Sequence, residues 1–128
     1  MNLLLDTCTF LWLARGSAEL SDTARALFTE PTHRVYLSAV SAWEIGVKHG
    51  LGRLPLPVSP CRFVPETRRA LGIEALPLGE EETLTVARLP PLHRDPFDRM
   101  LVCQALARGL VLLTPDPEIA RYPVRTAW

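Results

Sequence analysis

The chain has 128 residues, close to the commonest size of a domain, so we expect a single domain over residues 1–128. Fourteen basic residues balance fourteen acidic ones, so the net charge gives no global signal for a nucleic-acid partner. The three cysteines are odd in number and far apart, which argues against a disulfide framework and a CxxC zinc site. No apolar run reaches the ~18 residues that span a membrane. We therefore expect a cytoplasmic protein with reduced thiols and no membrane segment.

The first half of the chain alternates predicted strands and helices. Leu3 to Leu5 form a short apolar run that stops at Asp6, which is typical of a buried strand. Residues 34–38 (RVYLS) predict a second strand, and the proline-rich stretch 51–60 predicts a loop. Helices are expected over residues 9–16, 23–30 and 41–50, the first and last of them ended by glycine.

The second half continues the alternation and ends in a predicted edge strand. The stretch 61–72 indicates helix on both sides of Pro65, with a kink there. The segment 79–89 predicts a helix with its acidic residues in the first turn, where the helix dipole favours them. The remaining expected elements are a strand at 72–78, a helix within 93–109, an apolar strand at 110–114, a short turn or helix at 115–122 and a strand at 123–128.

This order of elements predicts an α/β fold. Strands that alternate with helices form βαβ units, whose right-handed crossovers build a mostly parallel sheet with helices on both faces. In open sheets of this kind the ligand site lies beyond the C-terminal ends of the strands, where the strand order reverses. The polar residues at those ends are therefore the candidates for function.

Four carboxylates are predicted at that edge of the sheet. Asp6 ends the first strand, and Asp116 lies two residues beyond the strand at 110–114. Glu44 and Asp98 are each predicted in the first turn of a helix next to the sheet. Clustered carboxylates repel one another unless a cation neutralises them, and magnesium and manganese prefer oxygen ligands. The four acids together predict a divalent metal site, and such an ion can activate water and stabilise the charge of a phosphodiester in displacement.

Helix capping is an alternative explanation for two of these acids. Asp95 can cap the helix that follows, with Pro96 at its first position and Asp98 as the third residue of a capping box. Ser41 and Glu44 have the spacing of a second capping box. Each pattern alone has a structural explanation, and the coincidence of four acids at one edge favours the site.

Structural alternatives also exist for the other two acids and for the neighbouring basic and aromatic residues. Asp116 lies between two prolines and is also a natural turn residue, and Asp6 can cap the helix that follows it. Arg94 and Arg99 flank the acids and could contact substrate phosphates or pair with a carboxylate. The histidines share no ligand spacing and are expected at the surface, and two tryptophans are expected in the core or an interface: His33, His49, His93, Trp12 and Trp43.

Three stretches resemble the sequence blocks of a known family. They are LLLDTCTFLW, LSAVSAWEIGVKHG and HRDPFDRMLVCQALARGLVLLTPD, and together they are similar to PIN domains over essentially the whole chain. The closest resemblance is to the VapC-type toxins of bacterial type II toxin–antitoxin systems. The spacing from the DPFDRM block through the apolar helix to the TPD block is the most specific part of the match.

The resemblance implies a fold, an activity and a set of residues. It implies a PIN-like three-layer α/β/α sandwich and an endoribonuclease that depends on Mg²⁺ or Mn²⁺, in which activated water attacks the RNA phosphorus. It further implies a homodimer, silenced by a small cognate antitoxin whose basic side chain enters the acidic groove. By position, the implied catalytic acids are Asp6, Glu44, Asp98 and Asp116, with Asp6, Asp98 and Asp116 as metal ligands and Thr7, Thr114, Asp95 and Arg99 as substrate-positioning residues.

Two other functions remain as alternatives. An aspartate-based phosphotransferase or phosphatase would also use an acid such as Asp6 at a strand end. A phosphatase of the DxDx[TV] kind needs an acid where Cys8 stands, and a receiver domain needs a lysine after a late strand, whereas Lys48 is the only lysine. The second alternative is a PIN module that binds RNA without cutting it, and metal binding that disappears in Asp98→Asn would distinguish the nuclease from it.

Overall fold

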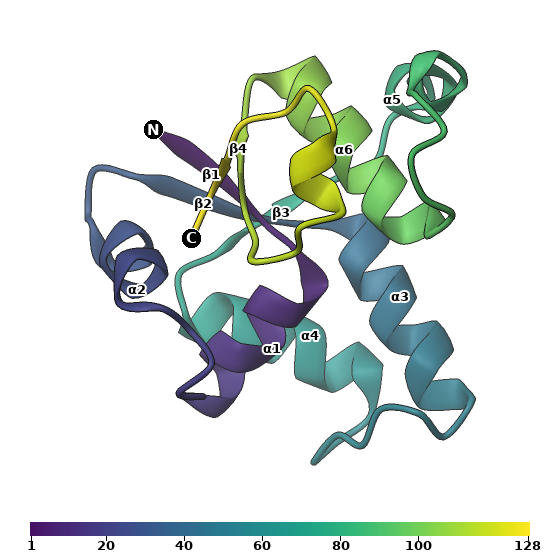
Figure 1. The fold of residues 1–128 in the computed structure, drawn as a ribbon. Coiled ribbons are helices and arrows are strands. Elements are labelled where there is room, and N and C mark those ends of the chain that lie inside the picture. The colour runs from purple at the N-terminus through teal and green to yellow at the C-terminus, as the bar shows by residue number, and fades with distance from the viewer.

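A five-stranded parallel sheet forms the centre of the computed structural model, which describes all residues 1–128 (Figure 1). All four strand pairings are parallel, in the order β3-β2-β1-β4-β5. This arrangement confirms the predicted α/β class and places the last strand at an edge. The strands are β1 (Asn2–Leu5), β2 (Arg34–Ser38), β3 (Glu74–Leu76), β4 (Val111–Leu113) and β5 (Thr126–Ala127).

Helices connect the strands and form the two outer layers. Hydrophobic side chains alternate along each central strand, so that Leu3 and Leu5 pack on one face of the sheet and Leu4 on the other. The first face is covered by α1, α2 and α4, and the second by α6, against which α5 packs (Figure 1). The helices are α1 (Thr7–Arg15), α2 (Asp22–Thr29), α3 (Ala39–Gly50), α4 (Pro60–Ala70), α5 (Glu80–Thr85) and α6 (Pro96–Arg108), with short 3-10 helices η1 (Val86–Arg88) and η2 (Ile119–Arg121).

The start of α3 differs from the prediction. The helix begins at Ala39 rather than residue 41, because the hydroxyl of Ser38 accepts from the backbone N–H of Val40 and supplies the N-cap. The predicted capping box of Ser41 and Glu44 is therefore wrong, and Glu44 lies in the second turn of α3. Serine favours the N-cap at either position, and Ser38 is the cap because β2 ends there.

Two other helices differ in detail from the expected elements. The predicted helix over 79–89 is divided into α5 and η1. In contrast, α4 runs through Pro65 without interruption. Proline removes one backbone donor from the helix. The burial of Phe63 and Val64 in the core next to Pro65 stabilises the helix in spite of that loss. None of the helices combines the length and the apolar character that crossing a bilayer requires.

The strand order reverses next to β1, and this reversal positions the site. The chain proceeds outward from β1 through β2 to β3, and then returns to the other side of β1 as β4 and β5. The C-terminal ends of β1 and β4 therefore lie side by side, as their pairing of Leu5 with Leu113 shows. An open parallel sheet places its ligand site beyond such a point.

Candidate active site

A cleft of about 410 Å³ opens beyond the C-terminal ends of β1 and β4. Four acids reach it from four parts of the chain: Asp6 follows β1, Glu44 lies on α3, Asp98 lies on α6 and Asp116 follows β4. The structure thus brings together all four acids singled out in the sequence. We call this region the acidic cleft, and its lining is Asp6, Thr7, Cys8, Trp12, Glu44, Lys48, Asp95, Asp98, Pro115, Asp116 and Pro117.

Asp6 is held at the junction of β1 and α1. Its Oδ1 accepts the backbone N–H of Thr9 at 2.8 Å, so Asp6 is the N-cap of α1, and its Oδ2 accepts the hydroxyl of Thr114 at 2.5 Å. The residue is 5% exposed, and burial raises its pKa despite these hydrogen bonds. The capping and functional interpretations therefore describe the same side chain.

Glu44 is buried and already has partners on both carboxylate oxygens. The hydroxyl of Thr7 donates to Oε1 at 2.6 Å, and the ammonium of Lys48, one turn later on α3, donates to Oε2. Burial opposes the charge on Lys48, but the hydrogen bond and the charge of Glu44 outweigh it and raise the pKa of the ammonium. Lys48 is thus a cation built into the acidic cleft, and its i, i+4 spacing from Glu44 is a signal that the sequence contains.

Asp98 lies in the first turn of α6, as predicted. Asp95 is the N-cap, because its Oδ1 accepts the backbone N–H groups of Phe97 at 2.9 Å and Asp98 at 3.1 Å, and Pro96 stands at the first helical position. Burial, together with the charges of neighbouring acids led by Asp95 and Glu44, raises the pKa of Asp98 to about 7. The carboxyl therefore lacks enough positive charge around it to ionise readily.

Thr114 and Asp116 form the fourth corner of the cleft. The backbone N–H of Asp116 donates to the Thr114 hydroxyl at 3.1 Å, and the backbone N–H of Glu118 donates to Asp116 Oδ1 at 2.9 Å. Because the Thr114 hydroxyl also donates to Asp6, it links the two acids that follow β1 and β4. The predicted hydroxyl positions, Thr7 and Thr114, therefore both hold carboxylates of the cleft.

Two residues differ from their expected environments, and for Trp43 one of the two expected environments is excluded. Arg99 does not line the cleft: its Nη1 donates to the carbonyl of Pro90 and to the hydroxyl of Tyr122. His93 was expected at the surface, but its side chain is 14% exposed and its Nε2 lies 3.5 Å from Asp98 Oδ2. Trp43 is 57% exposed, which excludes it from the core. His93 and Arg99 both bond to Tyr122, 29 and 23 residues away, and no local pattern signals such contacts.

The donor set fits a hard divalent cation. Asp6, Asp98 and Asp116 offer carboxylate oxygens to one cleft, and a bound cation would favour the charged form of Asp98, whose pKa burial and the neighbouring acids raise. No group of three His, Cys, Asp or Glu side chains is arranged closely enough to hold an ion as the side chains stand. The side chains would have to rearrange to hold an ion, and Glu44 is already occupied by Thr7 and Lys48.

Cys8 introduces a thiol into the lining of the cleft. Its side chain follows the pair Asp6 and Thr7, and the residue is exposed. Burial of the sulfur and the charges of Asp6 and Glu44 raise its pKa to about 11. The thiol therefore stays protonated at neutral pH and is a weak nucleophile.

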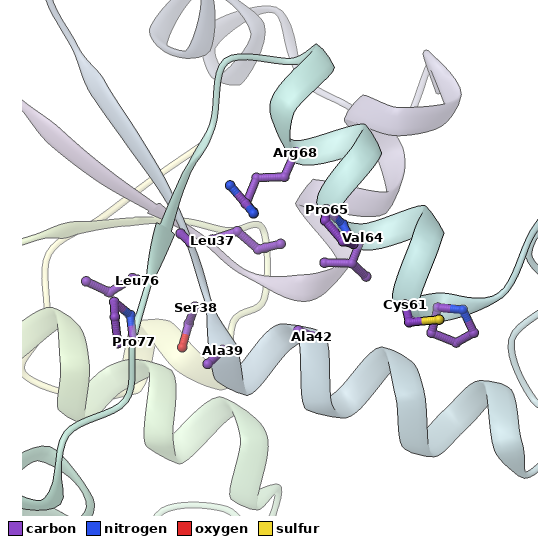
Figure 2. A pocket seen from close by; sticks show the side chains of 12 residues that line it. Leu37, Ser38, Ala39, Ala42, Cys61, Val64, Pro65, Arg68, Leu76 and Pro77 are labelled. Carbon is purple, nitrogen blue, oxygen red and sulfur yellow. The ribbon is translucent and has the colours of Figure 1, made fainter.

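A second hollow, of about 490 Å³, lies between α3, α4 and β3 (Figure 2). Apolar side chains such as Leu37, Val64 and Leu76 dominate its lining, and Arg68 is its only charged residue. It contains no carboxylate, and the acids gather elsewhere. The chemistry of the molecule is therefore concentrated in the acidic cleft.

The fold and the cleft define a class of protein: a parallel α/β domain with carboxylates gathered where its strand order reverses. The chain belongs to the PIN domain family, whose model matches residues 3–124. Ribonuclease VapC16 of Mycobacterium tuberculosis is 33% identical to it over 69 residues. That alignment covers 54% of this chain and 49% of VapC16, so the match spans about half of that relative.

Solved structures share the fold over nearly the full length. VapBC2 from Rickettsia felis, bound to a DNA fragment from its promoter, superposes with a TM-score of 0.75 at 14% identity, covering 100% of this chain and 99% of that one. VapBC-1 from nontypeable Haemophilus influenzae gives a TM-score of 0.66 at 16% identity, covering 99% and 97%. These similarities confirm the PIN-like α/β/α fold.

Proposed function

We propose that this chain is a metal-dependent endoribonuclease that acts as the toxin of a toxin–antitoxin pair. The observation that carries the proposal is the convergence of Asp6, Glu44, Asp98 and Asp116 on one cleft of a PIN domain. The similarity to a VapC ribonuclease supports RNA as the substrate. Two observations weaken the aspartate phosphotransferase alternative. The chain belongs to the PIN family, and Cys8 stands where a phosphatase of that kind needs an acid.

Each acid has a distinct proposed role. Asp6, Asp98 and Asp116 would hold Mg²⁺ or Mn²⁺, and the chemistry such an ion supplies is activation of water and neutralisation of charge on the phosphate. Glu44 keeps Lys48 in the cleft, where the ammonium reduces repulsion among the acids and attracts the RNA backbone. The reaction would leave a 5′-phosphate and a 3′-hydroxyl.

The neighbouring polar groups hold this arrangement. Thr7 and Thr114 donate to Glu44 and Asp6 and keep both carboxylates pointed at the cleft. Asp95 caps α6 and thereby fixes the turn that carries Asp98. The hydroxyls therefore act on substrate position through the acids they hold.

The proposal extends to partners and location. The structural neighbours include VapBC toxin–antitoxin complexes, which supports a small antitoxin as the partner of this chain. An antitoxin with a basic side chain would suit the acidic cleft, since it would supply the positive charge that Asp98 lacks. We further propose a homodimer that acts in the cytoplasm.

The decisive test is a map of new RNA 5′ ends after the chain is induced in a bacterial host. Asp98→Asn serves as the control, with circular dichroism to establish that it folds. Sharp new ends that appear only with the intact protein would establish the endoribonuclease and name its target. Equal maps, together with RNA binding by both proteins, would instead favour the non-catalytic RNA-binding module.

A further inference from the structure

One buried polar atom stands out next to the acidic cleft. His93 Nε2 is the only buried side-chain nitrogen or oxygen in the chain without a hydrogen-bond partner. It points at Asp98 Oδ2 from 3.5 Å, beyond the usual length of an N–H···O bond. A buried polar group without a partner is costly, so its persistence calls for an explanation.

The hydroxyl of Tyr122 determines which ring nitrogen of His93 carries the proton. It accepts the backbone N–H of His93 at 3.2 Å and Arg99 Nη1 at 3.0 Å, and these two donors occupy its two lone pairs. The hydroxyl proton is then left to donate to His93 Nδ1, which lies 2.7 Å away. Nδ1 is therefore an acceptor, and the ring proton lies on Nε2, facing Asp98.

The other two histidines have the opposite arrangement. Nδ1 of His33 lies 2.9 Å from the carbonyl of Leu27, and Nδ1 of His49 lies 2.9 Å from the carbonyl of Leu54. A carbonyl oxygen only accepts, so Nδ1 must carry the proton in both rings. His93 alone presents an Nε2–H group, and it presents that group to an acid of the cleft.

We propose that His93, oriented by Tyr122, is a positioning residue that holds the Asp98 carboxylate in the cleft. A shift of roughly 0.5 Å would bring Nε2 and Oδ2 to ordinary hydrogen-bond length. One oxygen of Asp98 would then be held by the ring while the other stays available to the cleft. What Asp98 does once it is held rests on the proposed function, but the hydrogen-bond arrangement does not.

The tautomer is tested first, by long-range ¹H–¹⁵N correlation of the histidine rings at a pH above the ordinary imidazole range. We expect His93 to show a proton on Nε2, and His33 and His49 to show theirs on Nδ1. In Tyr122→Phe the His93 signal alone should change. A His93 ring that matches the other two in the wild type would overturn the inference, whatever the protein does to RNA.

Two substitutions of His93 separate positioning from packing. In His93→Gln the side-chain amide N–H can take the place of Nε2–H, whereas in His93→Asn the amide reaches only the place of Nδ1, beside Tyr122. If the ring positions Asp98, Gln should keep more Mn²⁺ affinity than Asn, and Asn and Tyr122→Phe should lose roughly 10- to 100-fold. An Asn variant that binds Mn²⁺ as well as Gln or better would overturn the inference.

Matched controls and a kinetic readout complete the experiment. Tyr36→Phe removes the chain's other tyrosine hydroxyl, and His33→Gln changes a histidine far from the cleft, so both should leave Mn²⁺ affinity unchanged. With an RNA substrate, Tyr122→Phe should lower kcat and leave KM nearly unchanged. The wild type could bind Mn²⁺ and show the expected tautomer but cut no RNA. That result would contradict the proposed function and leave the positioning of Asp98 by His93 intact.

Discussion

Glu82 packs against α6 and Asp98 is part of it, and their carboxylates have opposite surroundings. Glu82, on α5, is 4% exposed and lies against the C-terminal half of α6. Its oxygens accept from the backbone N–H of Gly79 and from the side chains of Gln104 and Arg108. Burial opposes its ionisation, but these donors outweigh it and lower the pKa of Glu82.

Asp98, at the N-terminal end of α6, has almost no donors. Its nearest side-chain partner is His93 at 3.5 Å, and burial together with the acids around it raises its pKa to about 7. The chain thus satisfies a buried carboxylate fully where the role is structural. It leaves the carboxylate short of positive charge where a cation or a basic side chain is expected to bind.

The largest expected effect is on cleavage. Asp98→Asn keeps the shape of the side chain but removes a charge proposed to hold the metal, so RNA cleavage should fall by roughly 10³-fold or more, equivalent to about 4 kcal/mol. Glu82→Gln should cut RNA at the wild-type rate, because its carboxylate lies outside the cleft. Initial rates on one RNA substrate test both. Near-wild-type cleavage by Asp98→Asn would remove it from the proposed site.

Metal binding should stabilise the wild type and leave the variant unchanged. At a Mn²⁺ concentration about 100 times the dissociation constant, the free energy of unfolding should rise by about 2.7 kcal/mol. Asp98→Asn should gain little under the same conditions. Urea unfolding with and without Mn²⁺ measures the difference. Equal stabilisation of both proteins would mean that the ion binds elsewhere.

Glu82→Gln should instead reduce stability. The substitution removes the charge that strengthens the hydrogen bond from Arg108. It also leaves one amide oxygen to accept from three donors that the carboxylate satisfied with two oxygens, so the free energy of unfolding should fall by about 1–3 kcal/mol. Glu81→Gln, an exposed neighbour on α5, is the matched control and should change stability little. Urea unfolding compares the three proteins. A loss as large in Glu81→Gln would assign the effect to the helix dipole rather than to the buried donors.

The last expected contrast is an opposite dependence of stability on pH. In the unfolded chain Asp98 has the ordinary aspartate pKa of 3.8, whereas folding raises its pKa to about 7. The wild type should therefore lose stability relative to Asp98→Asn as pH rises from about 4 to 7.

For Glu82 the sign is reversed because its pKa is lowered by folding. The advantage of the wild type over Glu82→Gln should be complete above the ordinary glutamate pKa and disappear as pH falls below it. Thermal midpoints across this range, measured without divalent metal, compare the two pairs. Slopes of the same sign for both acids would contradict the contrast between them.

Much of the site follows from local patterns. The strands at Leu3–Leu5 and 34–38 and the cap at Asp95 are where hydrophobic runs and capping rules predict them. The gathering of the acids follows too, since residues at the C-terminal ends of parallel strands meet at one edge. The start of α3 was missed, because Ser38 and Ser41 are equally good caps and the β2 ladder chooses between them.

The sequence by itself determined the α/β class and the chemical nature of the cleft, because both depend on hydrophobic period and on which residues follow the strands. Only the tertiary structure decided how each carboxylate is held. Glu82 finds its donors on α6, and His93 meets Asp98 and Tyr122, 29 residues further along the chain. Such contacts depend on how helices pack on the sheet, and packing joins side chains that no local pattern relates.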